Sequence, residues 1–84
     1  MYELKYRQKA IKALSKINEP HYTAIIAAID KLVENPRPHG YKKLTGRNGY
    51  RLRVGTYRIM YDLFDKEVVI EIVNIGVRGK IYEH

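Results

Sequence analysis

Three arginines alternate with apolar and aromatic residues in the stretch 50–61, and this pattern is suited to binding phosphate. The stretch reads YRLRVGTYRIMY and places Arg51, Arg53 and Arg58 around the dipeptide Gly55-Thr56. A two-residue loop that begins with Gly favours a type II′ turn between antiparallel strands. Because side chains alternate between the two faces of a strand, all three arginines project from one face of this hairpin. The planar guanidinium, with its fork of donors, matches phosphate well.

The register of the hairpin brings two like charges together. With a two-residue loop, Val54 pairs with Tyr57 and Arg53 pairs with Arg58, at roughly 5 Å between Cβ atoms. Like charges placed opposite each other destabilise a sheet, and a bound anion would relieve the repulsion. Alternatively, the arginines only keep an exposed face soluble or prevent sheet-to-sheet association. Lysine is the more usual residue for those tasks, so we favour an anion site.

The positive charge of the chain is concentrated around this hairpin. The formal net charge is +7. Seven basic residues and no acidic residue lie between Asn35 and Tyr61, which leaves nine basic residues to balance all nine acidic ones. A localised positive field attracts polyanions, and nucleic acid is the commonest polyanion in a cytosol. Asp62 and Glu71 lie outside this stretch, and we expect them to pair with a nearby arginine.

Length and composition argue against a multi-domain, disulfide-bonded or membrane-spanning protein. The 84 residues allow one domain, 1–84. Cysteine is absent, which excludes disulfides and thiolate-metal sites and is typical of a cytoplasmic protein. The apolar runs are far shorter than the roughly 18 to 20 residues of a membrane span, and the first residues lack the apolar region of a signal peptide. His21, His39 and His84 have neither metal nor catalytic spacing, so we predict three surface histidines, no metal and no cofactor.

Hydrophobic periodicity predicts the elements that carry the hairpin. Residues 2–6 alternate as in a short strand. From Arg7 the apolar period becomes helical, and a second helix begins at Pro20 and ends before residues 35–38. Two helices joined by a short link should pack as an antiparallel hairpin. Residues 36–49 form a loop in which Leu44 is the expected anchor to the core.

Three further strands are predicted at 50–54, 57–64 and 68–75. A two-residue loop, Asp65-Lys66, would put Val69, Val73 and Ile75 on the arginine face, whereas a three-residue loop would reverse the faces of the last strand. Residues 76–82 predict a turn followed by a short helical stub. The order strand, helix, helix and three strands predicts an α+β domain, in which the helix pair covers one face of a small, mainly antiparallel twisted sheet.

The motifs GYKKLTG at 40–46, YRLRVGTYRI at 50–59 and IGVRGKIY at 75–82 resemble the RelE/ParE superfamily of toxins of type II toxin–antitoxin systems. The resemblance covers nearly the whole chain and is nearer to the RelE branch, whose toxins cleave mRNA in the ribosomal A site. It implies a RelE-like fold and three partners, namely a cognate antitoxin, the ribosome and mRNA, with no membrane or small-molecule cofactor. ParE-type toxins share the fold but inhibit DNA gyrase, which is the alternative function. A third possibility is a catalytically weak relative that only binds antitoxin or RNA.

The resemblance also assigns roles to individual residues. It implies that the RNA 2′-OH attacks its own 3′-phosphate, with arginines stabilising the charge that develops. A tyrosine would stack on a base or accept the 2′-OH proton. The five positions that match the catalytic residues of RelE-like toxins are Arg51, Arg53, Arg58, Arg78 and Tyr82. Val77 stands where many relatives have a histidine that could act as acid or base. For RNA binding outside this set, we predict the basic and aromatic loop residues Tyr41, Lys42, Lys43 and Arg47.

Overall fold

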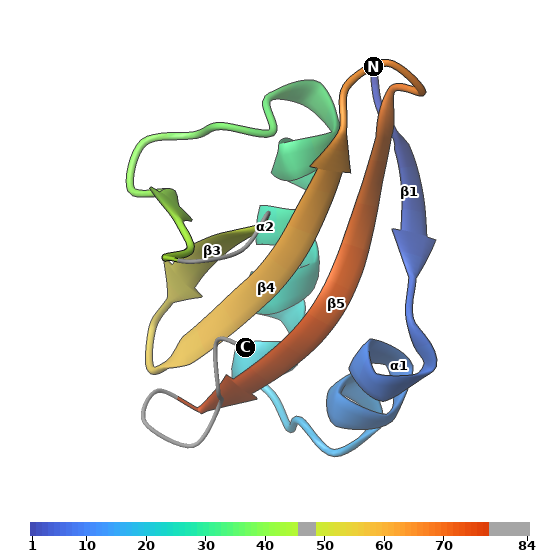
Figure 1. Ribbon diagram of the computed structural model, residues 1–84. Helices are drawn as coiled ribbons and strands as arrows, with labels where there is room; N and C mark the ends of the chain where they lie inside the picture. Colours follow the sequence, from blue (N-terminus) through green and yellow to red (C-terminus); the bar gives the residue numbers. More distant parts are fainter. Residues whose placement is uncertain (46–48, 78–84) are drawn as a thin grey trace.

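The computed structural model describes residues 1–45 and 49–77. Two helices and five strands lie in this part of the chain (Figure 1). They are, in order, β1 (Glu3–Tyr6), α1 (Gln8–Ser15), α2 (His21–Glu34), β2 (Lys42–Lys43), β3 (Tyr50–Val54), β4 (Tyr57–Phe64) and β5 (Val69–Val77). The α+β class is therefore confirmed. Helix α2 begins one residue after the predicted start, because Pro20 is its N-cap.

The strands form one mixed sheet with the order β1-β5-β4-β3-β2. β1 runs parallel to β5, and the other neighbours are antiparallel. Strand β2 lies inside the region predicted as a loop, so that prediction was wrong for residues 42–43. Two residues are too few to leave a periodic signal in the sequence. Their pairing with β3 nevertheless decides which side of the sheet each lysine faces.

The arginine hairpin has the predicted bounds and register. β3 and β4 pair with Arg53 opposite Arg58 and Val54 opposite Tyr57. Gly55 has φ +60°, as the first position of a type II′ turn requires. Gly adopts this conformation without the steric cost that a Cβ atom would add. The turn residue and the register are therefore linked.

The connection from β4 to β5 differs from both predicted versions. Phe64 pairs with Val69, so the loop has the four residues 65–68. The register also shifts between Met60 and Tyr61, as at a β-bulge. As a result Ile75 pairs with Ile59 and is buried in the helix-side core. Its place on the arginine face, which was expected for a two-residue loop, was therefore wrong.

Val73 of β5 packs on the arginine face, and the strand extends further than predicted. Val73 packs against Met60, which pairs with Arg51 and so shares the arginine face. β5 continues to Val77, through positions 76 and 77 where a turn was predicted. The rest of the predicted turn and stub, 78–82, lies outside the described residues.

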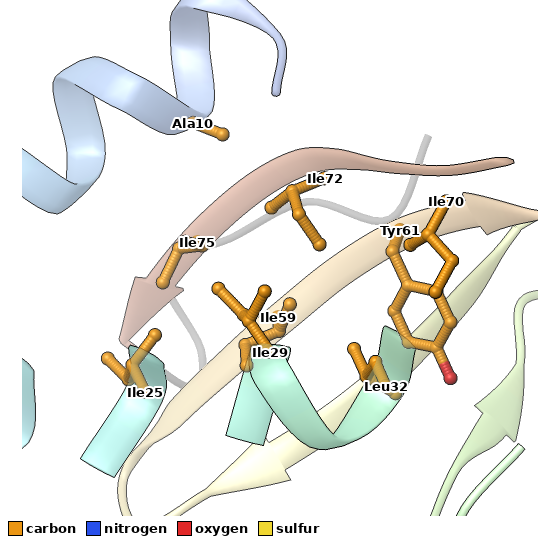
Figure 2. Packing of buried hydrophobic residues seen from close by; sticks show 9 residues of the cluster. All are labelled: Ala10, Ile25, Ile29, Leu32, Ile59, Tyr61, Ile70, Ile72 and Ile75. Carbon is orange, nitrogen blue, oxygen red and sulfur yellow. The ribbon is translucent and has the colours of Figure 1, made fainter. Parts of the chain in front are cut away.

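One apolar cluster joins the helices to the sheet, as Figure 2 shows. The helices provide Ala10, Ile25, Ile29 and Leu32, and the strands provide Ile59, Tyr61, Ile70, Ile72 and Ile75. Both helices therefore cover the same sheet face, as predicted. In Figure 1, α2 lies behind β3 and β4, and α1 lies beside the end of β5. Two large helical side chains lie outside this core: Ile11 of α1 is 49% exposed and Tyr22 of α2 is 40% exposed.

The loop that precedes β3 is anchored from several directions. Leu44 is buried as predicted, but in a small second cluster with Met60 rather than in the main core. Its backbone N–H donates to the Gly49 carbonyl at 2.9 Å. At the start of the loop, the buried Tyr61 hydroxyl donates to the Pro36 carbonyl at 2.8 Å. These contacts hold residues 36–44 against the edge of the hairpin.

Within residues 1–45 and 49–77, no helix has the length and apolar character needed to cross a membrane.

Candidate functional site

A cavity of about 300 Å³ lies over the arginine hairpin. The described residues that line it are His39, Gly40, Lys42, Arg51, Leu52, Arg53 and Arg58. This volume is at the lower end of the range for ligand sites, which suits one segment of a longer chain. The ionisable side chains in this lining are basic, and no carboxylate is among them. The cavity therefore favours an anionic ligand.

Strand register brings these cations together. Lys42 of β2 lies opposite Arg51 of β3, and Arg53 of β3 lies opposite Arg58 of β4. Directly opposed residues project from the same sheet face, so three neighbouring strands contribute to one row. Arg51 and Arg58 are half-buried, whereas Lys42 and Arg53 are exposed. Gly76 of β5 lies opposite Arg58 and adds no side chain to this face.

The predicted RNA-binding residues separate between the two faces. Lys43 lies opposite Tyr50, one position along from Lys42, and so belongs to the face that bears the helices. The Tyr41 ring packs on Tyr50 with centroids 5.8 Å apart, and Tyr50 in turn stacks on Tyr61 at 5.7 Å. The structure thus places Lys42 in the cavity lining, but neither Lys43 nor Tyr41.

Arg37, the first basic residue of the charged stretch, is engaged outside the cavity. Its guanidinium donates to the Asp65 carboxylate at 2.9 Å and lies 5.5 Å from the centre of the Tyr50 ring. The Tyr2 hydroxyl also donates to Asp65, at 2.7 Å. These hydrogen bonds lower the pKa of Asp65, and the one from Arg37 has the larger effect. Arg37 therefore links the loop before β2 to the turn between β4 and β5.

Acidic residues on the open sheet face are paired with another arginine. Asp62 of β4 lies opposite Glu71 of β5. Arg7 contacts Asp62 at 3.5 Å and Glu71 at 3.2 Å. The expected pairing of these two carboxylates with an arginine is confirmed. It occurs beyond Met60, toward the opposite end of β4 from the Arg58 position.

His39 is the residue of this site that the sequence analysis missed. It is exposed, as predicted for all three histidines, but it lines the cavity together with the arginines. His21 instead packs against the Tyr57 ring, with centroids 5.2 Å apart. Spacing along the sequence could not reveal His39, because the loop at 36–41 folds it against strands that come later in the chain. A histidine close to the Lys42-Lys43 pair was the available signal.

Four of the residues named from the sequence lie outside the described residues, namely Arg47, Arg78, Tyr82 and His84. The last residue of β5, Val77, pairs with Tyr57 beside Arg58. Within the described ranges, no three His, Cys, Asp or Glu side chains are grouped so that they could hold a metal ion.

Comparison with known proteins places this chain in a family. The family model described as ParE toxin of type II toxin-antitoxin system, parDE, matches residues 4–82. The chain belongs to the RelE/ParE superfamily of type II toxin–antitoxin toxins. This confirms the family that the sequence motifs indicated. A RelE-like toxin protein of Escherichia coli is 25% identical over 81 residues, which are 94% of this chain and 85% of that protein.

Solved structures of RelE toxins share the fold. The archaeal RelE–RelB complex from Pyrococcus horikoshii OT3 contains a chain with a TM-score of 0.83 and 31% identity, covering 95% of this chain and 98% of that one. The intact E. coli RelBE toxin–antitoxin complex contains one with a TM-score of 0.81 and 25% identity, covering 95% and 100%. The predicted RelE-like fold is thus confirmed.

Proposed function

We propose that this toxin is a ribosome-dependent endoribonuclease that cleaves mRNA in the A site and so inhibits translation. The observation that supports this proposal is the basic cavity, into which three strands bring Lys42, Arg51, Arg53 and Arg58. Cations at this density suit an RNA phosphate. The resemblance of the motifs to the RelE branch gives the reaction and the target.

In the proposed reaction, the RNA supplies its own nucleophile. The 2′-OH attacks the adjacent phosphorus and the bond to the 5′ oxygen breaks, leaving a 2′,3′-cyclic phosphate and a free 5′-OH. Negative charge accumulates on the phosphate in the transition state, and preorganised cations stabilise it there. Arg58, which is half-buried on β4 at the end of the row, would bind this phosphate. Lys42, Arg51 and Arg53 would hold the flanking backbone, while Arg78 and Tyr82 are assigned to the reaction from the family motif alone.

A cognate antitoxin is part of the proposal. The solved RelE structures from P. horikoshii and E. coli are complexes with RelB. An acidic antitoxin segment bound across the arginine row would neutralise it and exclude RNA. This partner would keep the toxin inactive until the antitoxin is removed.

The test is induced expression of the toxin followed by mapping of mRNA 5′ ends. We expect growth arrest and new 5′ ends inside translated frames. Arg58→Ala should abolish both, because it removes the proposed ligand of the reacting phosphate. Lys66→Ala is the matched control, since it removes one positive charge from the turn after β4 and should leave the cuts unchanged. Normal cutting by a folded Arg58→Ala protein would contradict the proposal.

Gyrase inhibition is the second candidate, because the family model that matches the chain carries the ParE description. Under this alternative, expression would induce DNA damage signalling without new mRNA 5′ ends. Purified toxin would then stabilise cleaved DNA complexes of gyrase. If strong expression is harmless, the chain is instead a catalytically weak relative that binds antitoxin or RNA.

A further inference from the structure

We propose that His39 is the general base of the arginine cavity and takes the proton from the attacking 2′-OH. This inference rests on the proposed function, because it requires RNA in the cavity. The inference supplies a proton acceptor, which the row of arginines lacks. A guanidinium remains protonated across the physiological range and is a poor proton acceptor.

The composition of the cavity lining singles out His39. The ionisable side chains among the described lining residues are His39, Lys42, Arg51, Arg53 and Arg58. Ammonium and guanidinium groups carry only donors, whereas a neutral imidazole has one nitrogen that accepts. Of the described lining side chains, His39 is therefore the one whose neutral form offers a nitrogen that can accept a proton.

The backbone around His39 is held from both sides. The Pro36 carbonyl accepts the buried Tyr61 hydrogen bond, and the Tyr41 N–H donates to the Pro38 carbonyl at 3.1 Å. Gly40, with φ +93°, completes the turn in a conformation that favours glycine, and nothing lies within 4 Å of the position a Cβ would take. The turn places the imidazole on the cavity wall while leaving it exposed. His39 is thus positioned by its backbone and remains accessible to a substrate.

Positively charged groups surround His39 in the cavity. Lys42 comes from β2, Arg51 and Arg53 from β3, and Arg58 from β4. The carboxylates of this sheet face lie beyond Met60, where Arg7 contacts both. Because no carboxylate is among the described residues that line the cavity, a phosphate bound to the row would add a negative charge beside the imidazole. Its 2′-OH would then lie within the same small cavity.

The proposed step balances without an outside reactant other than water. The imidazole nitrogen takes the 2′-OH proton as the 2′ oxygen forms its bond to phosphorus. The bond from phosphorus to the 5′ oxygen breaks, and that oxygen takes a proton from water. The imidazolium returns its proton to the resulting hydroxide. The products are the cyclic phosphate and the 5′-OH end, with His39 regenerated.

The test compares His39→Gln with the unchanged toxin on ribosomes programmed with a defined mRNA. We expect the single-turnover cleavage rate to fall by about 10²–10⁴, the usual contribution of general acid–base catalysis. The rate of the unchanged toxin should rise with pH over the range in which imidazoles lose their proton, and this rise should be absent from His39→Gln. Added imidazole should partly restore cleavage by His39→Gly. Binding of an mRNA with a 2′-O-methyl group at the cleavage site should be equal for His39→Gln and the unchanged toxin.

His21→Gln is the matched control, because it removes an imidazole that packs on Tyr57 away from the cavity, and its rate should be unchanged. If His39→Gln keeps the full rate and pH profile while Arg58→Ala does not cut, the role of His39 is refuted and the proposed function stands. If His39→Gln only weakens binding of the methylated mRNA, His39 is a positioning residue and the base assignment is also refuted. If the unchanged toxin cuts no mRNA on programmed ribosomes, both proposals fail together.

Discussion

The hydroxyl of Tyr61 donates a buried hydrogen bond to the carbonyl oxygen of Pro36, 2.8 Å away. Tyr61 is the largest fully buried side chain of the core, and Pro36 begins the loop that carries His39. The same phenol ring stacks on Tyr50 at the start of β3. The core of this toxin therefore extends directly to the wall of its candidate site.

Replacing Tyr61 with Phe should lower the free energy of unfolding by about 1–3 kcal/mol. The ring and its packing remain, but the buried Pro36 carbonyl loses its donor. Urea denaturation measures the change. Tyr22→Phe is the control, because Tyr22 is 40% exposed and lies on the surface of α2. Equal stability of the two variants would show that the Tyr61 hydrogen bond contributes nothing net.

The same tyrosine predicts a loss of stability in alkali. Burial raises the pKa of Tyr61, while a tyrosine in the unfolded chain ionises near pH 10. Above about pH 10 the unfolded state therefore binds fewer protons than the folded state, so stability is complete below that pH and falls as pH rises further. Between about pH 8 and pH 11, Tyr61→Phe should lose less stability than the unchanged toxin. Burial also raises the pKa of Tyr6, so part of the slope should remain.

The register of the arginine hairpin could be predicted because its turn fixes it. A two-residue loop beginning with Gly55 permits one register, so the opposition of Arg53 and Arg58 could be derived from the sequence alone. The register of β5 could not. Its loop has four residues, and Val68 adopts φ +57°, a conformation that β-branched residues rarely adopt. The shift of register between Met60 and Tyr61 is what buries Ile75, and no residue pattern indicates that shift, so the burial of Ile75 was missed.

For a similar reason, only some of the residues that line the cavity could be predicted from the sequence. Lys42 and Lys43 are adjacent in sequence, and their assignment to opposite faces depends on two residue pairs with β3. His39 lies in a loop whose sequence has no periodic alternation of apolar and polar residues. Alternation along regular strands is readable in a sequence, whereas the path of a loop depends on tertiary contacts such as that of Pro36 with Tyr61.

Val68→Gly should raise the free energy of unfolding by about 1 kcal/mol. Glycine adopts a positive φ without the Cβ clash, which costs roughly 1–2 kcal/mol in an L-residue. Val68 is 42% exposed, so little apolar burial is lost. Val77→Gly is the matched control, because Val77 is 40% exposed in regular β5 and the same change should destabilise the strand. A loss of stability in Val68→Gly would mean that the strain at this turn is smaller than the cost of chain flexibility.

The Arg37–Asp65 contact predicts a stability change in acid. Hydrogen bonds from Arg37 and Tyr2 lower the pKa of Asp65 in the folded toxin. As pH falls below the ordinary aspartate value of about 3.9, the unfolded chain binds the proton first. The contribution of Asp65 is therefore complete above that pH and is lost as pH falls through the lower folded value.

Asp65→Asn should be less stable than the unchanged toxin near neutral pH, and this difference should shrink toward pH 2. The groups are exposed, so the effect is small and decreases with salt. Thermal unfolding at several pH values measures it. Glu67→Gln, which removes a carboxylate from the same turn, should show no comparable change. A difference that does not depend on pH would exclude the charge of Asp65 as its origin.

Arg53→Gln should affect stability and RNA binding with opposite signs. Arg53 lies directly opposite Arg58, and relief of this repulsion should raise the free energy of unfolding by about 0.2–1 kcal/mol at low salt. The gain should shrink at high salt, where exposed charges are screened. The same variant should bind ribosome-held mRNA more weakly, because one phosphate ligand is lost. Lys66→Gln removes a positive charge outside the cavity and should change neither property. A fall in both stability and RNA binding would instead make Arg53 a structural residue of the sheet. A residue that is retained for binding at the expense of stability must increase stability and weaken binding when it is replaced.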